Sequence, residues 1–144
     1  MPAPIDGMPG LVSFTAPAEA DNIPQAMEKI EGLLERLGCP AAKAAHVCTA
    51  ADEILSNIVF YAYPGGAKGS FTVEAEPVPG GVRIVFSDSG VPFDPLKRED
   101  PDVTLPADER PVGGLGIMMV KKLMDSVGYE RKDGRNVLTV LKNF

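Results

Sequence analysis

Two polar side chains in the segment 52–57 have the types and the spacing that would let them act together on one bound ligand. Glu53 and Asn57 are four residues apart, so both would leave the same face of a helix. The amide oxygen of Asn57 is a hard, neutral ligand that suits Mg²⁺, and the carboxylate of Glu53 could accept a proton from a water or hydroxyl group that attacks a phosphate. A solvated Glu/Asn pair on a helix surface is the alternative, and such pairs are common.

A second candidate lies at Asp88, Ser89 and Gly90, directly after an apolar stretch with the alternating pattern of a strand. An aspartate at that exit could accept a hydrogen bond from the exocyclic amine of adenine. Gly90 has no Cβ and would let the backbone pass close to the base. An ordinary Asp-Ser-Gly turn would explain the same residues, so this segment indicates a binding site only in combination with the other candidate segments.

A third candidate is the cluster Gly113, Gly114, Leu115 and Gly116, which opens the last long helix that the sequence predicts. Glycines let backbone amides approach phosphate oxygens, and a helix N-terminus adds positive partial charge. The cluster differs from a dinucleotide-binding fingerprint, because a polar, proline-containing loop precedes it and Met119 takes the position of the third glycine. A flexible hinge before a core helix is the alternative.

The composition is that of one soluble, folded domain. The chain has 144 residues, of which 44% are hydrophobic and 24% are charged, and this length buries a core without disulfides or a structural metal. Its 20 acidic and 14 basic residues give a net charge of -6, which disfavours binding to nucleic acid or to an anionic membrane. A bound phosphate group would therefore need local amides, a few basic side chains and a divalent cation.

Neither the cysteines nor the N-terminal segment indicates another class of protein. Cys39 and Cys48 have the spacing of neither a redox CxxC pair nor a zinc site, and the single histidine, His46, excludes a histidine-based metal cluster. We expect two reduced thiols, with Cys48 in the core. Residues 1–10 lack the basic start of a secretion signal and no stretch approaches about 18 apolar residues, so we expect a cytoplasmic protein.

Periodicity and turn residues predict the order of the secondary-structure elements. Apolar residues three or four apart predict helices, and alternation predicts strands joined by tight turns, of which Asp133-Gly134 is a strong signal. The predicted helices are 23–37 with Asn22 as its cap, a second from near 40 to 59, and a third from near 115 to 127 with Gly128 as its stop. The predicted strands are 11–15, 71–76, 82–87, 129–132 and 135–141.

This order of elements favours an α/β fold in a single domain that spans residues 1–144. A two-layer α/β sandwich, with an antiparallel or mixed sheet covered by helices on one face, is the simplest arrangement. The segment 88–112 is the one long irregular part of the sequence and is rich in proline, glycine and charge. Because loops of that length in compact domains are more often functional lids than plain connections, we place a lid at about 91–112.

Taken together, the three candidate segments resemble the N box, G1 box and G2 box of the ATPase superfamily that includes gyrase, heat-shock chaperone, histidine kinase and mismatch-repair proteins. The matching sequences are DEILSNIVFYAYPG at 52–65, DSGVPFDP at 88–95 and GGLGIMMVKKLMD at 113–125. They are most similar to those of the bacterial anti-sigma factor serine/threonine kinases. The resemblance covers residues 24–144 and implies the Bergerat-type fold of histidine-kinase-like ATPases, a mostly antiparallel sheet with helices on one face.

The resemblance also implies a role for each matching residue. Asn57 would coordinate Mg²⁺, Glu53 would be the general base, and Asp88 would bind adenine in ATP. The other candidate nucleotide-binding residues in or beside the matching segments are Gly90, Phe93, Arg110, Gly113, Gly114, Leu115 and Gly116. Members of this family phosphorylate a serine or threonine of an anti-anti-sigma (antagonist) protein and sequester a sigma factor when that antagonist is unavailable. The resemblance further suggests a homodimer.

One position departs from the superfamily pattern: Pro92 stands where many members have a second glycine in the G1 box. We expect this departure to affect phosphate transfer more than nucleotide binding. A rival hypothesis is therefore a binding module that uses ATP only to order its lid and switch a protein interface. The catalytic domain of a two-component histidine kinase is a weaker alternative, because no dimerising helix carries a phosphorylatable histidine, and His46 lies inside the predicted ATP-site helix.

Overall fold

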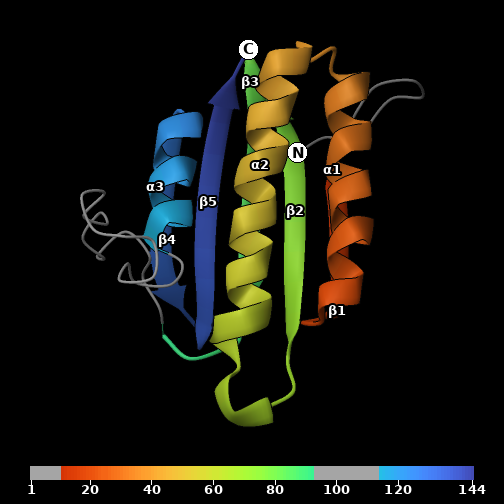
Figure 1. Cartoon of the computed structure of the whole chain (residues 1–144). Coiled ribbons are helices and arrows are strands. Elements are labelled where there is room, and N and C mark those ends of the chain that lie inside the picture. The colour runs from red at the N-terminus through yellow and green to blue at the C-terminus, as the bar shows by residue number, and fades with distance from the viewer. Residues whose placement is uncertain (1–10, 93–113) are drawn as a thin grey trace.

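Five antiparallel strands form one sheet, and three α-helices cover one face of it (Figure 1). The computed structural model describes residues 11–92 and 114–144. The strand order is β1-β2-β3-β5-β4, and every neighbouring pair is antiparallel. The predicted two-layer α/β sandwich is therefore confirmed. None of the helices in the described ranges has the length and hydropathy needed to cross a membrane.

The first half of the chain supplies an edge strand and two helices. β1 (Val12–Pro17) leads through a 3-10 turn into α1 (Ile23–Arg36), and Gly38, with a positive φ of 72°, follows α1 as predicted. Asn22 stands at the N-cap of α1, but its side chain does not cap the helix. Its Nδ2 instead donates to the carbonyl oxygen of Pro17 at 2.9 Å, which ties the start of α1 to the end of β1.

The second helix, α2 (Ala41–Asn57), continues directly into a π-helical turn, Ile58–Ala62. The wider turn changes the direction of the side chains that follow Asn57. A short 3-10 turn, Pro64–Gly66, then brings the chain back to the sheet. The sequence predicted one continuous helix here, because the apolar spacing of Ile58 and Val59 fits an α-helix as well as it fits a π-turn.

Two hairpins complete the sheet. The first joins β2 (Ser70–Val78) to β3 (Gly81–Asp88), and the second joins β4 (Ser126–Lys132) to β5 (Arg135–Asn143). Asp133 and Gly134 have φ values of 52° and 76°, the left-handed conformation that an Asp-Gly hairpin turn requires. Both predicted hairpins are confirmed, and they place the end of β3 beside the start of β5, where Asp88 pairs with Asn136.

The third helix, α3 (Gly114–Leu123), is shorter than the sequence predicted. The prediction that it runs to residue 127 and stops at Gly128 is wrong, because strand pairing begins at Ser126 and includes Gly128. The end of the helix is held by the sheet: the buried Lys142 Nζ donates to the carbonyl oxygen of Leu123, and the amide of Asp125 donates to Leu141 at 2.9 Å. These contacts between distant segments override the local helical pattern.

The core lies between the helices and the covered face of the sheet. Alternate residues of the strands point into it, and Phe71 on β2 is fully buried, with its ring centroid 6.1 Å from that of Phe14. On the opposite face, Arg83 and Glu76 form an ion pair across the first hairpin. The largest fully buried side chains are Phe71, Phe86, Ile30, Leu33, Leu34, Leu55, Ile84, Val47, Val82, Val120 and Val140.

Replacement of Phe71 by alanine should lower the free energy of unfolding by about 3–5 kcal/mol, because the substitution leaves a cavity that the packed layers fill only in part. Urea denaturation followed by circular dichroism measures the change. Glu74→Ala is the control, since Glu74 is exposed on the opposite face of the same strand and should change the value by about 0.5 kcal/mol or less. Equal effects of the two substitutions would contradict this description of the core.

Both cysteines are free thiols, as predicted. Cys48 packs against the core while remaining partly exposed, so the expectation that it lies in the core is met only in part. Burial raises the pKa of Cys48, and Glu31 and Cys39 raise it further. Burial also raises the pKa of Cys39, partly offset by the positive charges of Lys43 and Lys142. Both groups are therefore protonated at neutral pH, which agrees with structural rather than reactive thiols.

Candidate functional site

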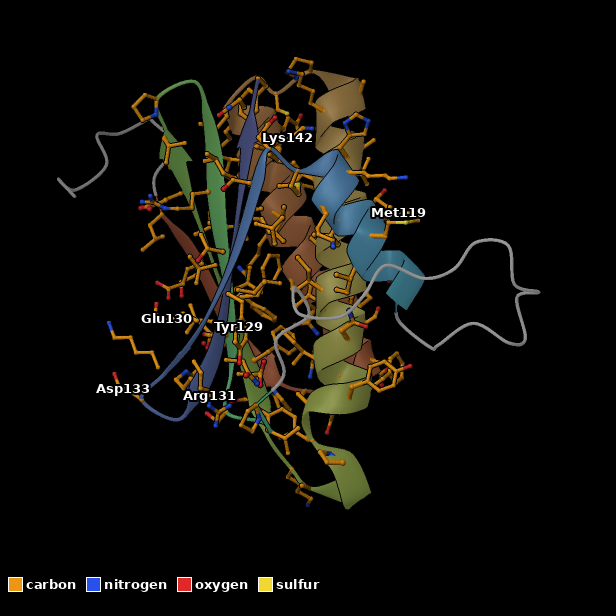
Figure 2. All side chains as sticks on the ribbon, turned by 90° about the vertical axis from the view of Figure 1, so that its left-hand side faces the viewer. Met119, Tyr129, Glu130, Arg131, Asp133 and Lys142 are labelled. Carbon is orange, nitrogen blue, oxygen red and sulfur yellow. The ribbon has the colours of Figure 1, made fainter. Side chains whose placement is uncertain are left out.

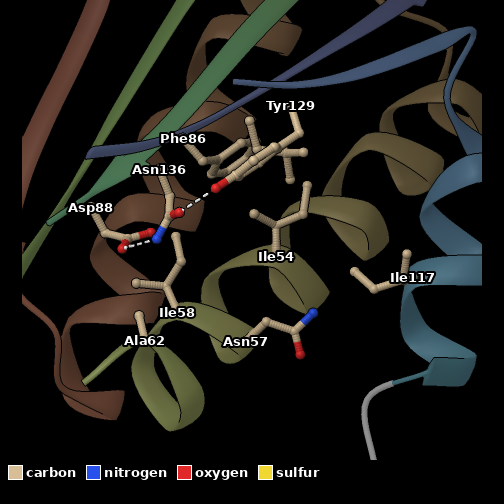
Figure 3. A pocket seen from close by; sticks show the side chains of 10 residues that line it. Ile54, Asn57, Ile58, Ala62, Phe86, Asp88, Ile117, Tyr129 and Asn136 are labelled. Atoms are coloured by element: carbon tan, nitrogen blue, oxygen red, sulfur yellow. Dashed lines mark hydrogen bonds between the residues drawn. The ribbon is translucent and has the colours of Figure 1, made fainter. Parts of the chain in front are cut away.

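A pocket lies between α2, the first turns of α3 and the covered face of the sheet (Figure 3). Most of its walls are apolar, and its polar side chains come from four residues on different elements. Such a combination of apolar walls and a few placed polar groups is typical of a small-molecule site. The lining residues are Ile54, Asn57, Ile58, Ala62, Phe86, Asp88, Ile117, Tyr129, Asn136 and Leu138.

Asp88 is the last residue of β3 and is only 4% exposed. Its Oδ1 atom accepts two hydrogen bonds, from the amide of Gly90 and from Nδ2 of Asn136, each at 2.9 Å. Its Oδ2 atom accepts no hydrogen bond from any residue that the structure describes. Asp88 lines the pocket, so a ligand there would meet a carboxylate that has one oxygen fixed by two donors.

Asn136, the second residue of β5, is 6% exposed and links Asp88 to the last hairpin. Besides its bond to Asp88, its Nδ2 donates to the carbonyl oxygen of Val91 at 2.8 Å. Its Oδ1 accepts from the hydroxyl of Tyr129 at 2.5 Å and from Nη1 of Arg131 at 3.2 Å. Tyr129 lies on the helix side of β4, whereas Glu130 lies on the opposite side (Figure 2).

Two arginines of the last hairpin hold the segment that begins at Asp88. Arg131 Nη1 donates to the carbonyl oxygen of Gly90 at 2.8 Å. Arg135 donates to the hydroxyls of Ser87 and Ser89 at 3.2 and 3.3 Å. Side chains of the β4–β5 hairpin therefore fix both the backbone and the side chains at the end of β3.

The π-turn holds the same segment from the helix side. The amide of Val91 donates to the carbonyl oxygen of Ala62 at 2.9 Å. The hydroxyl of Tyr63 accepts from the amide of Ser89 at 2.9 Å and donates to the carbonyl oxygen of Ser70 at 2.5 Å. The Asp88–Val91 segment is thus clamped between the end of α2 and the last hairpin.

The structure gives a packing reason for a glycine at position 90. A Cβ atom there would lie 2.3 Å from the carbonyl oxygen of Ala62 and 2.7 Å from its Cβ, distances that real side chains do not reach. The sequence suggested that Gly90 lets the backbone approach a bound base, and that role stays a prediction. The close approach of two backbone segments already excludes a larger residue.

Gly90→Ala should lower the free energy of unfolding by about 1–3 kcal/mol, because the Asp88–Val91 segment must move away from Ala62 to admit the methyl group. Thermal denaturation of purified variants measures this loss. Gly128→Ala is the matched control, since a Cβ at that position meets no atom within 4 Å. A Gly90→Ala variant as stable as the wild type would show that the close contact with Ala62 is not maintained in solution.

The two candidate site residues of α2, Glu53 and Asn57, lie one turn apart near its end. Asn57 lines the pocket and points away from Asp88, toward the side where α3 contributes Ile117 (Figure 3). Glu53 is partly exposed and stands outside the set of lining residues. Residues 11–92 and 114–144 contain no cluster of three or more His, Cys, Asp or Glu side chains that could hold a metal ion. A cation beside Asn57 would therefore need oxygen atoms from a bound ligand and from water.

The glycine cluster only partly belongs to the described structure. Gly114, Leu115 and Gly116 form the first turn of α3, as the sequence predicted, so their backbone amides belong to a helix N-terminus. Gly113, Phe93 and Arg110, the other candidate residues, lie outside the described residues. The predicted lid at 91–112 also lies outside them, apart from Val91 and Pro92, both of which are exposed.

Sequence reasoning missed Tyr129, Arg131 and Asn136. One signal was present: Asn136 has the same strand parity as Leu138 and Val140, so the period-two pattern places it on the buried face. A buried asparagine needs hydrogen-bond partners, which marks it as part of a polar network. Its partner Asp88 is 48 residues earlier in the chain, and no local spacing could reveal that contact.

Comparison with known proteins identifies the class to which this fold and pocket belong. Residues 16–142 match the histidine kinase-like ATPase domain, and the chain belongs to this family. The superfamily resemblance predicted from the three motifs is confirmed by this match. The match includes the whole of α2, the first hairpin, the second hairpin except Asn143, and all of the described pocket residues.

Individual relatives are named as kinases. The chain is 30% identical over 90 residues to the serine/threonine-protein kinase BtrW of Bordetella bronchiseptica, a match that covers 62% of this chain and 63% of BtrW. It is 26% identical to the serine-protein kinase RsbW of Listeria monocytogenes and 28% identical to that of Bacillus cereus. Each RsbW match covers 88% of this chain, and they cover 83% and 81% of the respective relatives.

A solved structure has the same fold. The RsbU and RsbW domains of Rv1364c from Mycobacterium tuberculosis match 92% of this chain with a TM-score of 0.67 and 17% sequence identity. The match covers 32% of the larger chain, so it extends over about one third of that protein. At this identity the comparison supports the two-layer fold and carries no residue-level argument.

Proposed function

We propose that this chain is an Mg-ATP-dependent protein serine/threonine kinase that acts on an anti-anti-sigma (antagonist) protein and binds a sigma factor when that antagonist is unavailable. Membership of the histidine kinase-like ATPase family supports the use of ATP. The names of the relatives from Bordetella, Listeria and Bacillus support transfer of phosphate to a protein serine or threonine. The choice of partner proteins rests on the resemblance of the three motifs to the anti-sigma kinases.

The observation that carries ATP binding is the arrangement of Asp88 in its apolar pocket. Oδ1 is fixed by Gly90 and Asn136, and Oδ2 is left as an acceptor on the pocket wall. The exocyclic amine of adenine is a donor of matching chemistry, and apolar side chains such as Ile54 and Leu138 suit the faces of the base. A hydrogen bond to a buried carboxylate contributes about 1.5–3 kcal/mol.

With adenine at Asp88, the triphosphate would extend toward Asn57 and the first turn of α3. The amides of Gly114 to Gly116 would donate to phosphate oxygens, and the helix N-terminus favours their negative charge. The amide oxygen of Asn57 would complete an Mg²⁺ site together with phosphate oxygens and water, an environment that Mg²⁺ prefers. When bound, Mg²⁺ supplies neutralisation of the charge on the β- and γ-phosphates.

Glu53 is the proposed general base. One turn before Asn57 on α2, its carboxylate would accept the proton of the serine or threonine hydroxyl as the oxygen forms a bond to the γ-phosphorus. The bond from that phosphorus to the β,γ-bridging oxygen breaks, and ADP leaves with the electron pair. Glu53 lies outside the lining of the adenine pocket, which suits a residue that faces the protein substrate.

The remaining parts of the proposal rest on the sequence. We assign Phe93, Arg110 and Gly113 to nucleotide binding, and the segment 91–112 to a lid that closes over ATP. We also propose a single domain at 1–144, a homodimer and a cytoplasmic location. Sedimentation velocity of the purified chain, with and without Mg-ATP, tests the dimer.

The decisive experiment is single-turnover transfer from [γ-³²P]ATP to purified anti-anti-sigma proteins encoded in the same genome as this chain. The expected result is one labelled serine or threonine in one of these proteins. Calorimetric titration with ATP, with and without Mg²⁺, is the parallel measurement and should show binding that Mg²⁺ strengthens. Absence of ATP binding would contradict the whole proposal.

Pro92 favours a second candidate function. It occupies the position of a superfamily glycine directly after the clamped Asp88–Val91 segment, and a proline removes both a backbone donor and φ freedom. A chain that binds Mg-ATP tightly but transfers no phosphate would be a nucleotide-dependent binding module. The same two measurements distinguish this module from the kinase.

A further inference from the structure

We propose that Asn136, oriented by Tyr129 and Arg131, is a positioning residue that sets the preference of the pocket for adenine over guanine. The inference rests on the proposed binding of ATP and assigns the selection of the base to side chains of the last hairpin. None of these three residues belongs to the motifs that suggested nucleotide binding. Tyr129 and Asn136 nevertheless line the pocket beside Asp88.

The hydrogen bonds fix which end of the Asn136 amide faces Asp88. The carbonyl oxygen of Val91 and the carboxylate of Asp88 can only accept hydrogen bonds, so the amide nitrogen must face both of them. The guanidinium of Arg131 can only donate, and the hydroxyl of Tyr129 also donates, so the amide oxygen faces them. Rotation of the amide by half a turn would break the contacts to Asp88, Val91 and Arg131, and only the hydroxyl of Tyr129 could reverse its role and accept from the amide nitrogen.

A fixed amide in turn fixes the carboxylate of Asp88. The Asn136 amide and the Gly90 amide both donate to its Oδ1, which fixes the plane of the buried carboxylate. Oδ2 therefore presents an acceptor, in one orientation, to the base. Adenine places an amine donor on its Watson–Crick edge at the position where guanine has a carbonyl acceptor. With guanine, the carbonyl oxygen of the base would face the carboxylate oxygen in a pocket with mostly apolar walls, and neither acceptor would have a donor.

Arg131 extends the same network to the backbone. It donates to Gly90 as well as to Asn136, while Asn136 holds Val91. The side chain and the backbone around the base-recognition residue are therefore fixed by one set of contacts. Loss of Asn136 would let the carboxylate rotate and admit water, and a water molecule can donate to the guanine carbonyl and to the carboxylate together.

The test is the ratio of the dissociation constants for GTP and ATP, each measured calorimetrically with Mg²⁺. We expect the wild type to favour ATP by about 100-fold or more, because the site opposes an acceptor to the guanine carbonyl. Asn136→Ala should weaken ATP binding and reduce the ratio to about 10-fold or less, because the carboxylate is no longer fixed. Tyr129→Phe removes only the hydroxyl and should reduce the ratio by a smaller factor.

Thr139→Ala is the matched control, because Thr139 lies on the same strand but has the opposite parity from Asn136 and so faces away from the pocket. Its ratio should equal that of the wild type. Equal weakening of ATP and GTP by Asn136→Ala would overturn the inference and leave Asn136 a purely structural role. If Asn136→Ala does not fold, an unchanged ratio in Tyr129→Phe overturns it. A wild type that binds neither nucleotide instead contradicts the proposed function.

Discussion

Replacing Glu53 with glutamine should reduce the rate of phosphate transfer by about 10²- to 10⁴-fold, because the amide cannot accept the proton of the attacking hydroxyl. Glutamine keeps the size and the helical position of the side chain on α2. Affinity for Mg-ATP should stay within about threefold of the wild type, since Glu53 lies outside the lining of the pocket. Single-turnover transfer from [γ-³²P]ATP measures the rate, and calorimetry measures the affinity.

The neighbouring residue offers the control for this experiment. Asp52 is an exposed carboxylate next to Glu53 on the same helix, and Asp52→Asn removes the same charge without removing the proposed base. Its transfer rate should equal that of the wild type. A Glu53→Gln variant that transfers phosphate at the wild-type rate would show that another group accepts the proton, or that positioning alone supplies the rate.

Asp88→Ala should reduce the affinity for ATP by about 10- to 150-fold, the factor that corresponds to a lost hydrogen bond of about 1.5–3 kcal/mol to a charged group. It should also lower the free energy of unfolding, because the amides of Gly90 and Asn136 lose their shared acceptor. An unpaired buried donor costs about 1–3 kcal/mol. Calorimetric titration and urea denaturation measure the two effects separately.

Glu130→Ala is the control for charge: it tests whether the loss of ATP affinity in Asp88→Ala comes from the lost contact with adenine or from the change in the net charge of the protein. Both substitutions change the net charge of -6 by one unit, but Glu130 is exposed on the side of β4 away from the helices (Figure 2). Affinity for ATP should be unchanged or slightly higher in Glu130→Ala, since an anionic ligand meets less repulsion. An equal loss of affinity in Asp88→Ala and Glu130→Ala would contradict the assignment of the adenine site.

The local patterns of the sequence predicted most of the fold. Strands were recognisable because they alternate and because turn residues such as Asp133-Gly134 separate them. The end of α3 was not recognisable, because Met124 and Val127 continue the helical spacing of apolar residues. Pairing of Val127 with Val140 in the sheet decides the structure of that segment, and this contact joins residues 13 positions apart. The π-turn at Ile58–Ala62 was missed for a related reason, since its apolar residues also suit an ordinary helix.

The candidate site was predictable where its residues lie close together in the sequence. Glu53 and Asn57 share one helix, and Asp88 and Gly90 share one turn, so their spacing carried the information. The residues that orient Asp88 were not predictable, because their role depends on which strand pairs with β3. Asn136 pairs with Asp88 in the register of β3 and β5, and the sequence alone leaves that register open. The family comparison identifies the class of protein, whereas these contacts are seen only in the structure.

The strand order also determines how folding depends on the length of the segment between the two hairpins. β3 and β5 are neighbours in the sheet, yet the whole segment between Asp88 and Ser126 lies between the two hairpins in sequence. Each hairpin closes locally, whereas the pairing of β3 with β5 also requires the entropy of closing the loop between them, which contains α3. That entropy grows with the logarithm of loop length, and a doubling costs about 0.6 kcal/mol. The pairing of β3 with β5 therefore depends only weakly on the length of chain that separates the two strands.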